Sequence, residues 1–237
     1  MSLLRLDKII SDGGIATRSE ARKLITSGKV IVDGNIVTRS DLKFDTETSE
    51  ISVDGDILNS TKYRYIMLNK PDGVLSATED REQKTVLDIL PPELYRMKLF
   101  PVGRLDKDTT GLLILTNDGD FCHAVTSPKR RIKKRYEFTS ESALTAEDAE
   151  EFLMGITLRD GTKCLPAELE IDLADPCHGY ISVFEGKYHQ VKRMLASRGK
   201  PVISLKRVAI GNLVLDKALG FGEYREISEN EIKQIFN

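Results

Sequence analysis

The stretch PVGRLDKDTTGLLILTNDGD, residues 101–120, decides the fold and carries the most specific chemical signal in the chain. A Gly-Arg-Leu-Asp turn leads into a short loop, and the apolar run GLLILT (111–116) then indicates a buried strand. An Asn-Asp pair follows as a helix cap, and DFCHAVT (120–126) is predicted to form a short helix. This arrangement would present the carboxylate of Asp106 at the rim of a sheet. On spacing alone, Asp106 could also be a turn residue or a cap.

Outward from this stretch, the sequence predicts short strands that are mainly connected as hairpins, together with several helices. Asp-Gly pairs supply the positive φ of tight turns, so KVIVDGNIVT, EISVDGDIL and ITLRDGTKCL are each predicted to be hairpins. Further strands are predicted at 65–69, 135–140 and 180–184 and in LKRVAI and LVL, and helices at 85–97 (with a Pro-Pro interruption), 145–155, 189–197 and after Ser228. Regular βαβ alternation is missing, which argues against a Rossmann or TIM-barrel arrangement. The sequence therefore predicts an α+β fold whose sheet is mixed and mainly antiparallel.

Residues 1–60 are predicted to form a separate small domain of two helices and a hairpin. LLRLDKIISD has helical periodicity, and a second helix is expected after Thr17, which has capping-box spacing to Glu20. The polar stretch NSTKYR (59–64) marks the boundary, which divides the chain into domains 1–60 and 61–237.

The second helix of this small domain carries positive charge on its outer side. Arg18 and Arg22 are four residues apart and therefore share one helix face, and Lys23 lies beside them. These charges alone are compatible with an ordinary solvated face as well as with contact to nucleic acid.

Composition limits the possible classes. The 237 residues carry a formal net charge of −2, and no apolar run approaches the length of a membrane span. The amino terminus has no signal-peptide pattern, so we expect a cytoplasmic protein without a membrane partner. The three cysteines lack metal-ligand spacing, and we expect no metal and no other cofactor.

Two basic clusters in the second domain nevertheless favour nucleic acid as a partner. Residues 129–135, KRRIKKR, hold six positive charges and no negative one, and residues 187–207 contain seven more without an acid. Such patches can match a phosphate backbone. The aromatic side chains Tyr136, Phe138 and Tyr188 lie beside them and offer stacking faces for unpaired bases.

At this point the sequence resembles a known family over essentially its full length, the RsuA type of ribosomal RNA pseudouridine synthase. GRLDKDTTGLLILTNDG is similar to the catalytic-loop signature of that family, which is long and specific, and IMLNKPDGV (66–74) to its first motif. KKRYEF (133–138) resembles its Lys-x-Tyr motif and EGKYHQVKRML (185–195) its third motif. Residues 1–60 resemble the RNA-binding domain shared with ribosomal protein S4.

The resemblance implies catalytic roles for three residues. Asp106 would be the nucleophile or the electrostatic partner at the ribose C1′, where a carboxylate suits a carbon that develops positive charge. Tyr136 would stack on the target base, and Lys192 would pair with Asp106 and keep it ionised. The chemistry implied needs neither a metal nor a redox cofactor.

The resemblance also implies RNA-binding roles. Arg104 would lie near the gap that the extruded uridine leaves, because an enzyme that acts on a base must extrude it. Lys70 would position backbone phosphates. The remaining residues expected to bind RNA are Arg18, Arg22, Lys23, Lys134 and Arg193.

Within this family the third motif favours the small-subunit branch. Related large-subunit enzymes tend to carry an Arg-Arg pair and lack the Tyr-His that this chain has at 188–189. We therefore expect 16S ribosomal RNA as the substrate, in a partly assembled small subunit. Separately, we expect the protein to be a monomer.

Three alternatives remain at this stage. One is a sister enzyme that modifies 23S RNA, and another is an RNA-binding or ribosome-assembly protein without catalysis, whose first 60 residues would look the same. The third is a metal-dependent nuclease that uses Asp106, Asp108 and Asp118, although the last two are more simply a loop residue and a helix cap.

Overall fold

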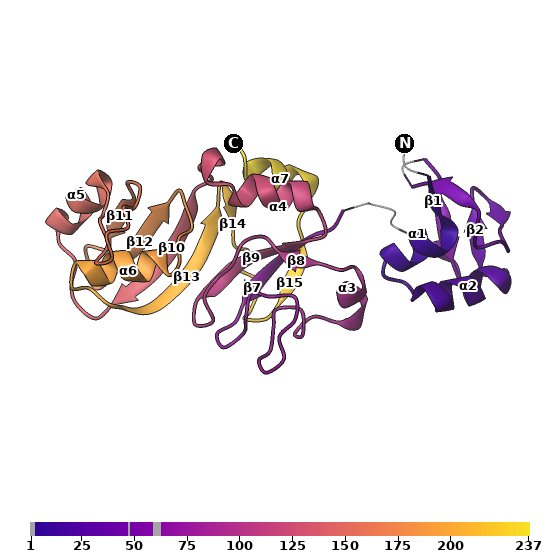
Figure 1. The fold of residues 1–237 in the computed structure, drawn as a ribbon, viewed down its shortest axis with the longest axis horizontal. Helices are drawn as coiled ribbons and strands as arrows, with labels where there is room; N and C mark the ends of the chain where they lie inside the picture. The colour runs from indigo at the N-terminus through magenta and orange to yellow at the C-terminus, as the bar shows by residue number, and fades with distance from the viewer. Residues whose placement is uncertain (1–2, 47, 59–62) are drawn as a thin grey trace. The chain divides into compact units, whose positions relative to one another are not determined.

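A computed structural model describes residues 3–46, 48–58 and 63–237 (Figure 1). Its contacts divide the chain into two units, residues 1–64 with 87–100, and residues 65–86 with 101–237. Each unit is described by itself. The predicted boundary at 59–64 falls mainly on residues 59–62, which lie outside the described residues, so it stays a prediction.

The first unit contains a pair of helices and small antiparallel sheets. Its elements are β1 (Leu3–Arg5), α1 (Leu6–Asp12), α2 (Arg18–Thr26), β2 (Val30–Val32), β3 (Asn35–Ile36), β4 (Lys43–Asp45), β5 (Ile51–Val53), β6 (Asp56–Ile57) and α3 (Pro92–Arg96). The predicted capping box of Thr17 and Glu20 is present at the start of α2. Both predicted hairpins also form, as β2 with β3 and β5 with β6.

A buried carboxylate organises the helix pair of this unit. Asp7 is fully buried at the start of α1, and it accepts hydrogen bonds from Arg22 at 2.9 Å and from Arg5 and Arg18 at longer range. Burial opposes its ionisation, but the bonds from Arg22 and Arg5 hold the pKa of Asp7 below its usual value. The shared face of Arg18 and Arg22 therefore has a structural use within the fold.

The second unit is built on a nine-stranded sheet (Figure 1). Its main path runs β11 (Glu168–Ile171), β12 (His178–Val183), β10 (Lys134–Ser140), β13 (Val202–Ile210), β9 (Thr110–Thr116), β7 (Tyr65–Lys70) and β15 (Tyr224–Glu226), while β14 (Leu213–Val214) pairs with β13 and β8 (Phe100–Pro101) with β9. Neighbours along the main path are antiparallel, except that β13 and β9 are parallel. The predicted α+β class with a mainly antiparallel sheet is confirmed.

The parallel contact between β9 and β13 explains the glycine at the second position of β9. Gly111 lies opposite Arg207 and has a φ of +96°. A Cβ atom at this position would come within 2.3 Å of the Arg207 carbonyl oxygen. Only glycine lets the strand that follows the Asp106 loop approach β13 so closely.

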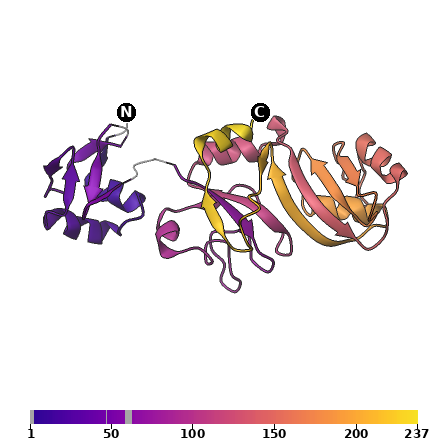
Figure 2. The same ribbon diagram turned by 180° about the vertical axis from the view of Figure 1, so that it is seen from behind.

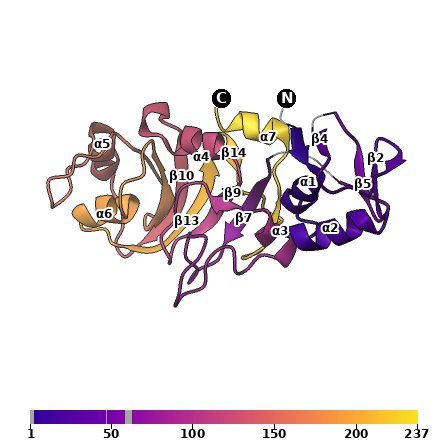
Figure 3. The same cartoon turned by 45° about the vertical axis from the view of Figure 1, so that its right-hand side comes forward.

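Helices pack over two apolar clusters. They are α4 (Gly119–Thr126), α5 (Ala146–Met154), α6 (Gln190–Ser197), α7 (Glu229–Gln234) and a short 3₁₀ turn (Pro128–Arg130). Phe152 of α5 and Met194 of α6 join the cluster over β10 and β12, whereas Phe121 of α4 belongs to the cluster on β9. In the views of Figures 1, 2 and 3, α4 lies beside α7. Among the described residues, no helix combines the length and the apolarity that crossing a membrane requires.

Three sequence predictions differ from the structure. Residues 3–5 form a strand paired with β4, so the helix predicted from LLRLDKIISD begins only at Leu6. Residues 85–91 are not helical, because Pro91 is extended and Pro92 can begin a helix but not continue one. The hairpin predicted in ITLRDGTKCL forms without regular strands, through a bridge between Thr157 and Lys163 and backbone hydrogen bonds that join 158 to 162 and 164 to 156.

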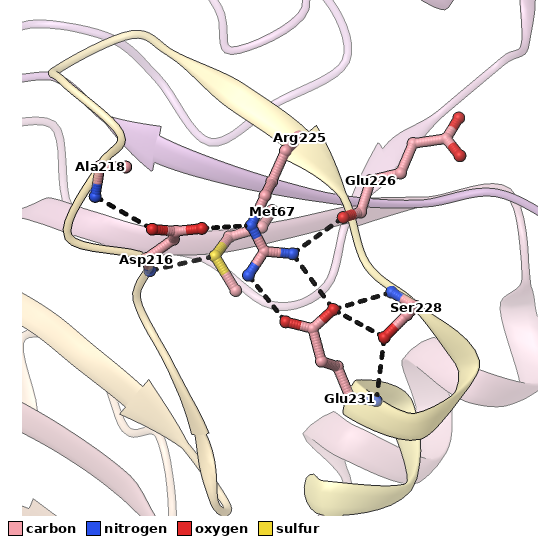
Figure 4. Close-up of polar contacts among 7 residues, drawn as sticks. All are labelled: Met67, Asp216, Ala218, Arg225, Glu226, Ser228 and Glu231. Carbon is pink, nitrogen blue, oxygen red and sulfur yellow. Dashed lines mark hydrogen bonds and ion pairs between the residues drawn. The ribbon is translucent and has the colours of Figure 1, made fainter.

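An ionic network fixes the carboxyl-terminal helix to the sheet (Figure 4). Arg225 on β15 donates to both carboxylate oxygens of Glu231 in α7, at 2.7 and 3.1 Å, and to Asp216 at 2.6 Å. Glu231 also accepts from the backbone and hydroxyl of Ser228, which caps α7 as predicted. The hydrogen bonds from Arg225 lower the pKa of Glu231 to about 2.

We expect Glu231→Gln to lower the free energy of unfolding at pH 7 by about 1–2 kcal/mol, because a neutral amide replaces a charged acceptor. The pKa of Glu231 is lower in the folded chain, so its contribution is complete above about pH 4.5 and is lost between about pH 4.5 and 2. Urea denaturation across this range measures it, with Glu229→Gln in the same helix as control. Equal stability of the wild type and the Glu231 variant at pH 7 would contradict the prediction.

Candidate active site

The loop that carries Asp106 is held by hydrogen bonds on both sides of that residue. The buried hydroxyl of Ser76 donates to the Leu105 carbonyl at 2.9 Å and accepts from the Leu105 amide at 3.0 Å. On the other side, the amide of Gly73 donates to the Lys107 carbonyl at 3.1 Å. Residues 73–76 therefore fix the backbone that precedes and follows Asp106.

Lys70 supports the same loop from the interior of the protein. The prediction that it contacts phosphates is therefore wrong. Its side chain is fully buried, and its ammonium donates to the carbonyls of Pro71, Lys107 and Thr109, each at 3.0 Å. These three bonds use all three donors of the ammonium group, so none is left for RNA. Burial lowers the pKa of Lys70 to about 8.

Asp106 lies in a small cluster of charged side chains. The Nζ atom of Lys192 is 3.4 Å from Asp106 Oδ2, and Nε2 of His189 is 3.4 Å from Asp106 Oδ1. Lys192 also contacts Asp108, and this hydrogen bond lowers the pKa of Asp108 below its usual value. Asp106 and Lys192 are both about three-quarters buried, at 25% and 22% exposure, so their attraction is less screened than at an open surface.

A pocket of about 710 Å³ opens beside Asp106. The sheet supplies Tyr136, Lys134 and Arg207 to its lining, the loop before β9 supplies Arg104, and the segment 185–189 supplies a further wall. Tyr136 is half-buried and packs against the neighbouring apolar cluster. The predicted residues Asp106, Tyr136, Lys192, Arg104 and Lys134 therefore come together in one place, although their roles stay predictions.

The wall at 185–189 is stiffened by buried polar contacts. Glu185 accepts from the side chains of Lys187 and Gln190 and, at 2.9 Å, from the backbone amide of Leu165. Tyr188, which is exposed, stacks on His189 with ring centroids 3.9 Å apart. The φ of His189 is +47°, a left-handed conformation that turns the chain into α6. The stacked pair lines the pocket, and the ring of Tyr188 is exposed to solvent.

The last three residues of the basic run 129–135 have different partners. Lys133 and Arg135 form ion pairs with Glu168 and Glu170. Lys134, between them, lines the pocket instead, and within the described part of the chain its one hydrogen-bond acceptor is the Val125 carbonyl, at 3.3 Å. Of these three, Lys134 is therefore the one that faces the site.

The remaining predicted RNA contacts lie elsewhere. Arg193 pairs with Asp160 and lines a separate hollow beside α6, not the pocket at Asp106. In the first unit, Lys23 is exposed on α2, while Arg18 and Arg22 bind Asp7 and remain about half exposed.

Sequence reasoning missed four residues of the site: Ser76, Asp108, His189 and Arg207. The sequence indicates Asp108 only as a possible metal ligand or a loop residue, and His189 only as a subfamily marker. Asp118, the third carboxylate of the nuclease alternative, caps α4 and accepts from Tyr65 at 2.6 Å. Among the described residues, no three His, Cys, Asp or Glu side chains gather as metal ligands.

Comparison with known proteins gives two family matches. Residues 64–197 match the RNA pseudouridylate synthase family, and residues 4–47 match the S4 domain. A solved structure described as a pseudouridylate synthase superposes with a TM-score of 0.69 at 38% identity, covering 98% of this chain and 99% of that one.

Curated relatives are similar over most of their length. The ribosomal small subunit pseudouridine synthase A of Vibrio cholerae is 42% identical over 98% of this chain and all of its own. The protein of the same name from Escherichia coli K12 is 44% identical over 73% of this chain and 74% of its own. An uncharacterised RNA pseudouridine synthase of Bacillus subtilis is 42% identical over 97% of both chains.

The placement of Lys70 generates a prediction about stability. We expect Lys70→Met to lower the free energy of unfolding by about 2–4 kcal/mol, because three carbonyls lose their partner. Lys107→Met is the matched control, since the Lys107 side chain is exposed while its carbonyl is one of the three acceptors. Chemical denaturation measures both variants. An unchanged stability of Lys70→Met together with weaker RNA binding would restore the phosphate role.

Proposed function

The chain belongs to the RNA pseudouridylate synthase family and is an RNA pseudouridine synthase, and we propose that it modifies a uridine of 16S ribosomal RNA with Asp106 as its catalytic residue. The observation that carries this proposal is the pocket in which Asp106, paired with Lys192, faces Tyr136. The names of the small-subunit relatives and the Tyr-His pair at 188–189 support 16S RNA as the substrate.

The reaction is an isomerisation that needs no net gain or loss of atoms. The bond between N1 of uracil and C1′ of ribose breaks, the base turns, and a new bond forms between C5 and C1′. The proton on C5 is then removed and N1 gains a proton. The carboxylate of Asp106 would attack C1′ or stabilise the positive charge that develops there.

The neighbours of Asp106 suit this role. Lys192 places a cation 3.4 Å from the Asp106 carboxylate, and the hydrogen bonds to Leu105 and Lys107 fix the loop backbone on either side. Tyr136 presents a ring on which the uracil can stack after it leaves the RNA helix. Arg104 is exposed at the mouth of the pocket, where it can occupy the position that the base leaves.

Substrate recognition would be divided between two domains, residues 1–60 for RNA binding and 61–237 for catalysis. The S4-domain match supports the first assignment. In that domain Lys23 and the exposed parts of Arg18 and Arg22 would contact phosphates and fix the position of the RNA. The protein would act as a monomer in the cytoplasm, on a partly assembled small subunit.

Asp106→Asn should abolish pseudouridine formation and leave RNA affinity within about twofold, because an amide is nearly isosteric but neither attacks C1′ nor stabilises its charge. Tritium release from 16S and 23S transcripts labelled at C5 measures the activity of wild type and variant. Asp108→Asn removes a carboxylate from the same cluster and serves as control, with a loss below about tenfold. Near-normal turnover by Asp106→Asn would contradict the catalytic assignment. Turnover by the wild type on the 23S transcript alone would contradict the 16S assignment.

Lys192→Met should lower the single-turnover rate at saturating enzyme by roughly 100-fold, because Asp106 loses its cation in a partly buried site. Lys192→Arg should keep part of the rate, since the charge survives in a different geometry. A surface lysine would instead affect mainly RNA affinity, in a salt-dependent way. An unchanged single-turnover rate in the Met variant rules out the ion-pair role.

A further inference from the structure

Two cations of the sheet, one buried and one half-buried, line the pocket without a carboxylate partner among the described residues. Arg207 is 4% exposed, its Nε donates to the Leu112 carbonyl at 2.7 Å, and its Nη2 has no hydrogen-bond partner among the described residues. Lys134 is half-buried, and in residues 3–46, 48–58 and 63–237 its ammonium donates only to the Val125 carbonyl. Two other lysines at the site, Lys187 and Lys192, are instead paired with acids.

The sheet places these two cations on the same face as Tyr136. Tyr136 pairs with Arg207 across β10 and β13, and directly paired residues of neighbouring strands point to the same side. Lys134 is two residues before Tyr136 on β10 and therefore points the same way. One face of the sheet thus offers an aromatic ring with two positive charges beside it.

Burying two like charges together is unfavourable unless an anion joins them. Burial, with a smaller contribution from Arg207, lowers the pKa of Lys134 to about 8. The pocket of about 710 Å³ is also larger than a stacked uracil requires. The two cations and the volume of the pocket therefore favour the binding of an anionic group of the substrate next to the base.

We propose that Lys134 and Arg207 form a subsite for an RNA phosphate adjacent to the extruded uridine. Phosphate is the anionic group of RNA, whereas uracil is neutral, and Arg binds phosphate oxygens through paired donors. The subsite would hold the extruded nucleotide by its backbone while the base turns at Asp106. This inference rests on the proposed function, because it assumes that a uridine enters this pocket.

Binding of small nucleotides tests the subsite independently of catalysis. The probes are uridine, uridine 3′-monophosphate and uridine 5′-monophosphate, with affinities measured by titration calorimetry and by chemical-shift perturbation in the full chain. Wild type should bind one of the two monophosphates at least tenfold more tightly than uridine. Lys134→Met should reduce this preference below about threefold, because the Met side chain keeps most of the shape and loses the charge.

Lys133→Met is the matched control, since Lys133 is the preceding residue and pairs with Glu168 on the other side. It should keep the full preference for the phosphate. Arg207→Gln should lose the preference as Lys134→Met does, and its thermal unfolding is followed because Arg207 also holds the Leu112 carbonyl. If only Arg207→Gln unfolds, Lys134→Met still decides the outcome.

Three results would overturn the subsite. They are no phosphate preference in wild type, a preference that survives in Lys134→Met, or an equal loss of affinity for uridine itself, which would place the cations on the base. Pseudouridine formation on ribosomal RNA by the same wild-type preparation separates the two proposals. Activity without a phosphate preference removes the subsite alone, whereas absent activity removes the proposed function.

Discussion

The buried ammonium of Lys70 is the interaction on which the candidate site depends. It joins the end of β7 to two carbonyls of the loop between β8 and β9, and the Ser76 hydroxyl adds a second link next to Asp106. A charged group can remain inside the protein only where its donors are all used, so this geometry is specific. A carboxylate carried on a loop thereby gains the fixed position that catalysis requires.

In the second unit, the pairing of cations with acids differs between the pocket and the rest of the surface. The chain has a net charge of −2, and many of its cations are neutralised locally, as Arg193 is by Asp160 and Arg225 by Glu231. At the pocket the pattern changes, because Lys192 is shared by two aspartates and Lys134 has no acidic partner among the described residues. The site therefore combines one oriented carboxylate with free positive charge, a combination that suits a sugar bound to phosphates.

Much of the fold could be predicted from local sequence signals, and much of the site could not. The capping boxes at Thr17, Thr145 and Ser228 and the strand 111–116 follow from neighbouring residues alone. Strand β1 forms by pairing with β4, and no local sequence pattern predicts this pairing. The sequence favours a phosphate contact for Lys70, because only the packed loop brings three carbonyls within reach of its ammonium. The position of Arg207 in the pocket could not be predicted either, because it depends on the pairing of β13 with both β10 and β9.

Quantitative mapping of pseudouridines in all ribosomal RNAs tests the central claim most directly. Three strains are compared. One lacks the gene, and the other two lack it but express either the wild-type protein or Asp106→Asn at equal levels. We predict that a 16S uridine is unmodified in the deletion strain, that wild type restores its modification and that Asp106→Asn does not. Restoration by Asp106→Asn, or a deletion that changes no pseudouridine in ribosomal RNA, would contradict the account.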